Sequence, residues 1–231
     1  MTEIQEEKRD MFYKIGGKDN FNKLLYGITK GIAGFGLNTI FNLKIEGKYN
    51  IPMHNKAILT TISENVMRDI FVISQATGRQ IHFMLSPKIM RNQMIGPILK
   101  TLGMFRSTES KEDKEPIEKV FDYLNNKNDL VAMTPEAKLD YDIQIKAMSA
   151  IIKFAAGVNV PIIPLTINIK KGKIFNMLDF NGLVLKIGTP LNIEKKIGRD
   201  KYRDQRYELA EGIIKIIDSL RKPKNNGAKH E

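Results

Sequence analysis

The chain contains no cysteine and only three histidines among its 231 residues. The absence of cysteine excludes disulfides, thiolate catalysis and cysteine-ligated zinc or iron–sulfur sites, and it fits a cytoplasmic location. The histidines, His54, His82 and His230, are too few for a histidine-rich metal cluster. We therefore expect a protein without a bound metal.

Long apolar runs are also missing from this sequence. Residues 1–19 are polar and hold no apolar segment of the kind that a secretory signal requires. The most apolar N-terminal stretch, 21–43, is interrupted by Lys23 and Lys30, and it contains four glycines. A spanning helix needs about 20 mostly apolar residues. The sequence therefore predicts neither a secretory signal nor a transmembrane helix.

Acidic residues are in the minority, because 37 lysines and arginines face 26 aspartates and glutamates and leave a net charge of +11. This excess favours a polyanionic partner, such as nucleic acid, anionic lipid or a phosphorylated substrate. A basic solvated surface is the alternative. Nucleic acid is disfavoured because the chain has no glycine-rich loop, aromatic platform or recognised nucleic-acid-binding helix motif. A hydrophobic content of 42% indicates a folded, globular protein.

Apolar residues near the N-terminus recur at helical spacing. They are Phe21, Leu24, Leu25, Ile28, Ile32 and Phe35. This periodicity predicts an amphipathic helix over residues 21–40. Two alternatives remain for its apolar side, which either packs on the protein's own core or lies in the surface of a bilayer.

The rest of the chain alternates between strand-like and helix-like segments. The expected strands are 41–46, 57–62, 80–85, 129–133, 160–169 and 183–187, and the expected helices are 66–77, 89–102, 111–126, 145–156 and a C-terminal helix holding 209–220. This alternation predicts an α/β fold, a single domain with a central mixed sheet flanked by helices. We expect a polar segment at 1–20, the domain at 21–221 and a basic tail at 222–231.

Two carboxylates follow the expected strand 57–62. Glu64 and Asp69 lie at the start of the next helix, and sites for chemistry collect at the carboxyl ends of strands in α/β sheets. The two side chains are therefore a candidate acid–base pair. The alternative is that Glu64 caps the helix that begins near Val66, with Asp69 solvated in its first turn. A carboxylate metal site that adds Glu136 is a third arrangement.

Taken in order, these segments resemble the motifs of the glycerolipid acyltransferases of the lysophosphatidic acid acyltransferase type. Residues 63–69 stand where that family has Asn-His-x-Ser-x-x-Asp, and residues 134–139 stand where it has Phe-Pro-Glu-Gly-Thr-Arg. Residues 160–164 are similar to its proline motif. The resemblance covers most of the chain and implies the acyltransferase fold. It also implies transfer of a fatty acyl group from acyl-CoA or an acyl-carrier protein to a lysophospholipid hydroxyl, with no further cofactor.

The same resemblance implies roles for individual residues. Asp69 matches the motif aspartate, whereas Glu64 stands where the family has its catalytic histidine. The second-motif arginine falls near Glu109, one turn from Arg106. The motif glycine and arginine of the third motif are replaced by Ala137 and Leu139. Four residues are expected to contact the substrate: Arg106, Pro135, Glu136 and Pro161.

The replacement of histidine bears directly on catalysis. Histidine, with an ordinary pKa of about 6.5, is a stronger base than glutamate, at about 4.3. Burial or a neighbouring carboxylate strengthens a glutamate as a base, and Asp69 would be that neighbour of Glu64. We therefore expect either an acyltransferase with Glu64 as its base, or a catalytically inactive member, a pseudoenzyme, that binds lipid or acyl groups. In both cases an anionic membrane surface is the expected partner, and a cytoplasmic protein attached peripherally to the membrane is the expected location.

Overall fold

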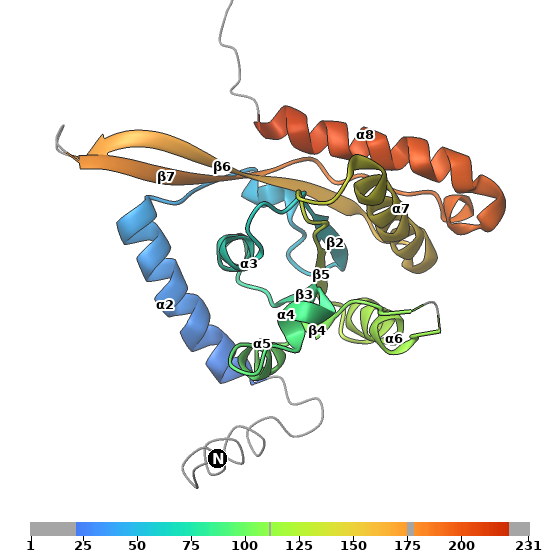
Figure 1. Ribbon diagram of the computed structural model, residues 1–231, viewed down its shortest axis with the longest axis horizontal. Helices are drawn as coiled ribbons and strands as arrows, with labels where there is room; N and C mark the ends of the chain where they lie inside the picture. The colour runs from blue at the N-terminus through green and yellow to red at the C-terminus, as the bar shows by residue number, and fades with distance from the viewer. Residues whose placement is uncertain (1–21, 111, 175–177, 222–231) are drawn as a thin grey trace, which may run out of the picture.

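The computed structural model describes residues 22–110, 112–174 and 178–221 (Figure 1). These residues form a seven-stranded sheet in the order β1-β7-β6-β2-β5-β3-β4. The strands are β1 (Lys44–Glu46), β2 (Ala57–Thr60), β3 (Ile81–Leu85), β4 (Phe105–Arg106), β5 (Leu130–Met133), β6 (Ile162–Ile174) and β7 (Leu178–Ile187). The prediction of a single α/β domain around a mixed sheet is confirmed.

Strand direction brings several strand ends to the same edge of the sheet. Strands β6, β2, β5, β3 and β4 run parallel to one another, so the carboxyl ends of β2, β5, β3 and β4 share one edge. Strand β7 turns back against β6 as an antiparallel hairpin, and β1 pairs with β7 in parallel. In Figure 1 this hairpin projects past the helices on one side of the molecule. The shared edge is where the segments around Glu64 and Glu136 meet.

Helices cover both faces of the sheet. One face carries α2 (Lys23–Phe41), α3 (Val66–Ser74), α4 (Pro87–Met90) and α5 (Gly96–Thr101), and the other carries α6 (Glu115–Phe121), α7 (Tyr141–Val158) and α8 (Arg203–Arg221). Consecutive strand residues point to opposite faces. Leu59 therefore belongs to the apolar core under α3, whereas its neighbour Ile58 belongs to the core under α7 and α8. Short turns of 3-10 helix lie at Lys48–Asn50, Lys195–Gly198 and Asp200–Tyr202, and a π-helical turn spans Asp122–Asn126.

Helix α2 forms where the apolar periodicity predicts it, but it buries a different side. Its N-terminus is capped by Asn22, and its buried residues are Tyr26, Gly34 and Leu37. Most of the predicted apolar stripe faces outward, with Leu24 and Phe35 about three-quarters exposed, whereas Leu25 packs against the core. The helix therefore packs on the protein's own core, but with only part of the predicted stripe in that contact, and Phe21 lies outside the described residues. Within the described segments, every helix falls short of the length and apolarity that crossing a bilayer demands.

Several predicted element boundaries are wrong for identifiable reasons. The strand expected at 41–46 begins only at Lys44, because α2 continues to Phe41. The helix expected at 89–102 is two short helices, α4 and α5. Gly96 lies against the Met90 carbonyl between them, where an added Cβ would sit 2.3 Å from that oxygen. Strand β4 is absent from the predicted elements, and the strands expected at 160–169 and 183–187 are longer than predicted, because β6 continues to Ile174 and β7 begins at Leu178.

Gly47 makes the turn between β1 and the chain that leads to β2. Its backbone lies in the left-handed region at φ 77°, and an added Cβ would sit 2.2 Å from the Ile187 carbonyl oxygen at the end of β7. The Asn50 side chain donates to that same oxygen at 3.0 Å. Only glycine fits this contact without strain, which fixes how the edge of the sheet leads into β2.

Candidate active site at the end of strand β2

The two loops expected to carry the site lie side by side. The Ser63 N–H donates to the Pro135 carbonyl at 2.7 Å, and the Ala137 N–H donates to the Ser63 carbonyl at 2.8 Å. At the ends of β2 and β5, the buried Thr60 hydroxyl donates to the Met133 carbonyl at 2.8 Å. These hydrogen bonds extend the pairing of β2 and β5 beyond their ends. The segments 63–69 and 135–137 are therefore held against each other by backbone hydrogen bonds.

Asp69 is buried, with 3% of its surface exposed. Its Oδ2 accepts a hydrogen bond from the Ser63 hydroxyl at 2.6 Å, and its Oδ1 accepts one from the Arg68 Nε at 2.9 Å. Burial raises the pKa of Asp69, while the bonds from Ser63 and Arg68 oppose that rise and Glu64 adds to it. The alternative that placed Asp69 in solvent is therefore wrong. Both of its oxygens are committed to protein donors.

Glu64 lies at the same turn but is half exposed. Its Oε2 is 3.9 Å from Arg68 Nη2, and its Oε1 is 3.5 Å from Arg221 Nη1. Within the part of the chain that the structure describes, no hydrogen bond joins Glu64 to Asp69. Helix α3 does begin at Val66, but it is capped by Asn65, whose Oδ1 accepts the Arg68 N–H at 3.0 Å. The prediction of Glu64 as the cap is wrong.

Arg221 reaches this site from the last turn of α8. Its Nη2 donates to the Ile62 carbonyl at 2.7 Å, and its Nε donates to the Thr166 hydroxyl at 3.3 Å. The remaining Nη1 faces Glu64 and is 3.9 Å from Asp218. Arg68, Arg221 and Ser63 were not identified from the sequence as residues of the site. The role of Arg221 depends on a contact across more than 150 residues, for which no local pattern gives a signal.

A pocket of about 400 Å³ opens beside the start of α3. Its walls come from α2, α3, β6 and β7: Leu37, Phe41, Asn65, Arg68, Phe71, Ile169 and Leu183. Five of these seven residues are apolar, and the two polar ones, Asn65 and Arg68, both belong to the turn that carries Glu64. An apolar pocket with a cation in its lining suits a hydrocarbon chain that bears an anionic group.

The structure separates the predicted substrate-binding residues. Pro135 and Glu136 lie next to Ser63, where Glu136 forms an ion pair with Lys138 at 2.6 Å. Pro161 lies at the opposite end of β2, where its carbonyl accepts the Ile58 N–H. Pro161 lines a different hollow there, together with Pro52 and Pro190. The structure therefore brings Pro135 and Glu136 to the site of Glu64, but not Pro161.

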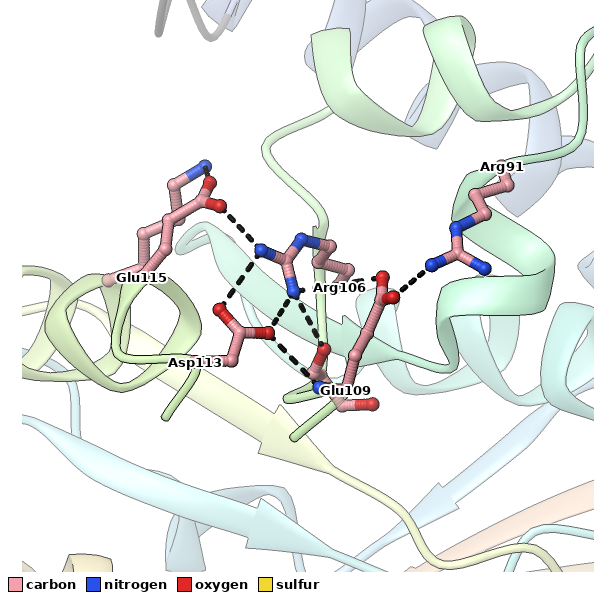
Figure 2. Close-up of polar contacts among 7 residues, drawn as sticks. Arg91, Arg106, Glu109, Asp113 and Glu115 are labelled. Carbon is pink, nitrogen blue, oxygen red and sulfur yellow. Dashed lines mark hydrogen bonds and ion pairs between the residues drawn. The ribbon is translucent and has the colours of Figure 1, made fainter. Parts of the chain in front are cut away.

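Arg106 stands at the carboxyl end of β4, on the same edge of the sheet but three strands from β2. Figure 2 shows its guanidinium enclosed by carboxylates. Asp113 accepts from both terminal nitrogens, Glu115 accepts at 2.7 Å, and Glu109, itself paired with Arg91, lies 3.8 Å away. The hydrogen bonds to Asp113 chiefly raise the pKa of Arg106, and they lower that of Asp113. An acceptor phosphate would have to displace these carboxylates to bind Arg106.

The other titratable groups do not complete a metal or histidine site here. Among the described residues, no three histidine, aspartate or glutamate side chains group closely enough to hold a metal ion, and this includes Glu64, Asp69 and Glu136. His82 is buried in β3, between the Gly103 carbonyl and the Asp129 carboxylate. The candidate chemistry of this edge therefore depends on carboxylates and arginines.

Comparison with known proteins relates this chain to acyltransferases. The acyltransferase family model matches residues 42–168. The chain is also similar to the crystal structure of the 1-acyl-sn-glycerophosphate (LPA) acyltransferase PlsC from Thermotoga maritima. The TM-score is 0.53 and the identity is 18%, over 99% of this chain and 86% of that chain. No curated protein matches the chain. At this identity the structural likeness concerns the fold.

Proposed function

Because the chain belongs to the acyltransferase family, we propose that it transfers a fatty acyl group from acyl-CoA or an acyl-carrier protein to the free hydroxyl of a lysophospholipid. The observation that carries this proposal is the position of Glu64. Its accessible carboxylate lies at the carboxyl end of β2, and the same turn supplies Asn65 and Arg68 to an apolar pocket. The pocket is suited to the hydrocarbon chain of such a lipid.

The proposed reaction needs one base and no cofactor. The acceptor's hydroxyl oxygen attacks the thioester carbonyl, forming the new C–O ester bond as the C–S bond breaks. Glu64 takes the hydroxyl proton during the attack and returns it to the departing thiolate. Positioned proton transfer of this kind contributes about 10²–10⁴-fold to the rate. Asp69 does not act on the acceptor in this scheme, because both its oxygens hold Ser63 and Arg68.

Attachment to an anionic membrane surface is part of this proposal. The outward stripe of α2 presents Leu24, Ile28, Ile32 and Phe35 to solvent. An exposed apolar helix face of this kind, on a protein of net charge +11, fits a position at the surface of a bilayer that contains anionic lipids. By this proposal the protein works peripherally on the cytoplasmic side and takes its acceptor from the membrane.

An acyl-transfer assay tests the proposal. The purified full chain is incubated with radiolabelled acyl-CoA or acyl-carrier protein and with vesicles containing a lysophosphatidate. We expect labelled diacyl product from the wild type and at least about a 100-fold loss in Glu64→Gln. The matched control is Glu211→Gln, which removes an exposed carboxylate on α8 that pairs with Lys215. Absence of product with every donor would overturn the proposal.

A catalytically inactive lipid-binding protein is the second candidate. It is favoured by the engagement of both Asp69 oxygens, since this aspartate is then unable to orient a base. On this alternative the wild type binds a single-chain phospholipid without turning it over. Glu64→His, which restores the motif histidine, also stays inactive. Turnover by either form would reject this candidate.

A further inference from the structure

The two arginines beside Glu64 have no role in the sequence motifs, and their placement suggests one. We propose that Arg68 and Arg221, the arginine pair, bind the phosphate of the acceptor lipid and that the phosphate replaces the Glu64 carboxylate between them. The proposal rests on the proposed function and names its acceptor as a phosphomonoester with one hydrocarbon chain.

Arg68 is held in place before any ligand arrives. Its Nε donates to the buried Asp69, which is fixed in turn by Ser63. The two terminal nitrogens of Arg68 make no hydrogen bond to any described residue. Because the side chain also lines the apolar pocket, the lining of that pocket includes an oriented guanidinium with unused donors. Planar guanidinium donors match phosphate oxygens well.

Arg221 is fixed in the same way from the other side. Its Nε and Nη2 are occupied by the Thr166 hydroxyl and the Ile62 carbonyl, so only Nη1 is directed at Glu64. The contact to Asp218, at 3.9 Å, is too long for a hydrogen bond. Two guanidinium groups from distant helices thus converge on one carboxylate.

The Glu64 carboxylate lies between the two guanidinium groups, where an anion is expected to bind, but it accepts no hydrogen bond from either of them. Its distances to the arginine pair, 3.9 Å and 3.5 Å, are those of ion pairs without hydrogen bonds. A phosphate carries more negative charge and more acceptor oxygens than a carboxylate, and it can accept directly from both guanidinium groups. The chain also lacks the motif arginine at Leu139, and Arg106 is enclosed by its own carboxylates. The arginine pair supplies the missing cation.

This exchange would couple acceptor binding to catalysis. When phosphate takes over the arginine pair, Glu64 loses its two cationic partners and becomes available as a base. In a lysophosphatidate the free hydroxyl is separated from the phosphate by only a few bonds, so it arrives close to that carboxylate. The hydrocarbon chain then extends past Arg68 into the pocket between α2 and α3.

Direct binding measurements test the arginine pair separately from turnover. The probes are a lysophosphatidate below its micelle concentration, a monoacylglycerol with the same chain, inorganic phosphate, and coenzyme A. The full chain is compared with Arg68→Gln, Arg221→Gln and Glu64→Gln. The matched control is Arg203→Gln, on an exposed arginine of α8 that bonds Tyr207. Thermal unfolding reports whether each variant folds. Arg221→Gln changes a partly exposed side chain at the end of α8, so it tests the same phosphate site if Arg68→Gln fails to fold.

We expect each arginine variant to weaken lysophosphatidate binding by about 10-fold or more, with monoacylglycerol binding unchanged. Glu64→Gln is expected to bind lysophosphatidate at least as tightly as the wild type, because it removes the competing carboxylate. If inorganic phosphate binds as tightly as lysophosphatidate, the hydrocarbon chain of the lipid adds no affinity. That result would assign the site to free phosphate and would overturn the lipid assignment. Unchanged lysophosphatidate binding in both arginine variants, or a loss confined to coenzyme A, would overturn the proposal. Lysophosphatidate binding that falls in these variants without any turnover would retain the arginine pair and reject the proposed reaction.

Discussion

Replacement of Ser63 by alanine tests how the buried carboxylate of Asp69 is stabilised. The Ser63 hydroxyl donates to Asp69 Oδ2 at 2.6 Å, and both residues are almost fully buried. A hydrogen bond to a charged group contributes about 1.5–3 kcal/mol, and alanine supplies no substitute donor. We therefore expect Ser63→Ala to lower the free energy of unfolding at pH 7 by about 2 kcal/mol. For a chain of this size that corresponds to a fall of about 4–8 °C in Tm.

The pH dependence of that loss follows from the pKa of Asp69. Burial raises this pKa above its ordinary value, and the Ser63 bond opposes the rise. Stability that the protonated carboxyl retains at acid pH is lost as pH rises through the folded-state pKa. Removing the Ser63 hydroxyl moves that pKa higher still. The difference between Ser63→Ala and the wild type therefore grows with pH through the interval between the two folded-state values.

Urea unfolding between pH 4.5 and pH 8 measures this difference. Ser219→Ala is the matched control, because that exposed hydroxyl donates to the Ile216 carbonyl within its own helix. A loss in Ser63→Ala no larger than in the control, or one that does not change with pH, would show that Asp69 does not depend on this hydroxyl as the geometry indicates.

Three further predictions concern stability and charge. In the wild type, the free energy of unfolding is expected to fall as pH rises through the folded-state pKa of Asp69. Asp69→Asn is expected to abolish this fall, because asparagine does not ionise. Urea titrations across pH test this, and a pH profile like that of the wild type would contradict it. Gly47→Ala is expected to cost at least about 1–2 kcal/mol from its left-handed backbone, whereas Gly212→Ala, in open space on α8, should be neutral or stabilising; equal effects in thermal unfolding would reject the steric account. Arg106→Gln is expected to raise the pKa of Asp113 toward its ordinary value, observed by carboxyl NMR titration, and no shift would mean that the enclosure in Figure 2 does not persist in solution.

Periodicity predicted the architecture well because it reports burial directly. The buried strands β2 and β5 are short apolar runs, and α3 begins at Val66 as expected. Periodicity did not predict which side of a helix is buried where that side is decided by the surface that the helix packs against. The outward stripe of α2 has the same spacing as a core-facing one, and tertiary contacts select the side that is buried: the Tyr26 hydroxyl accepts the Ile81 N–H, and Gly34 lies against Gln75 at the end of α3.

The candidate site was predicted only in part, for a similar reason. The motif spacing located Glu64 and Glu136 on adjoining loops and Asp69 in the first turn of α3, because strand ends in a parallel sheet share an edge. It did not indicate that Asp69 would bind Arg68, since that depends on the rotation of side chains within one helical turn. Nor did it indicate Arg221, which comes from the far end of the chain.

The most direct test of the proposed function is the rate of acyl transfer from acyl-CoA to a lysophosphatidate, measured side by side for the wild type, Glu64→Gln and Glu211→Gln. The proposed role of Glu64 as the base predicts product formation by the wild type and by Glu211→Gln, with a loss of about 100-fold or more in Glu64→Gln. Equal rates in all three proteins, or no product from any of them, would contradict it.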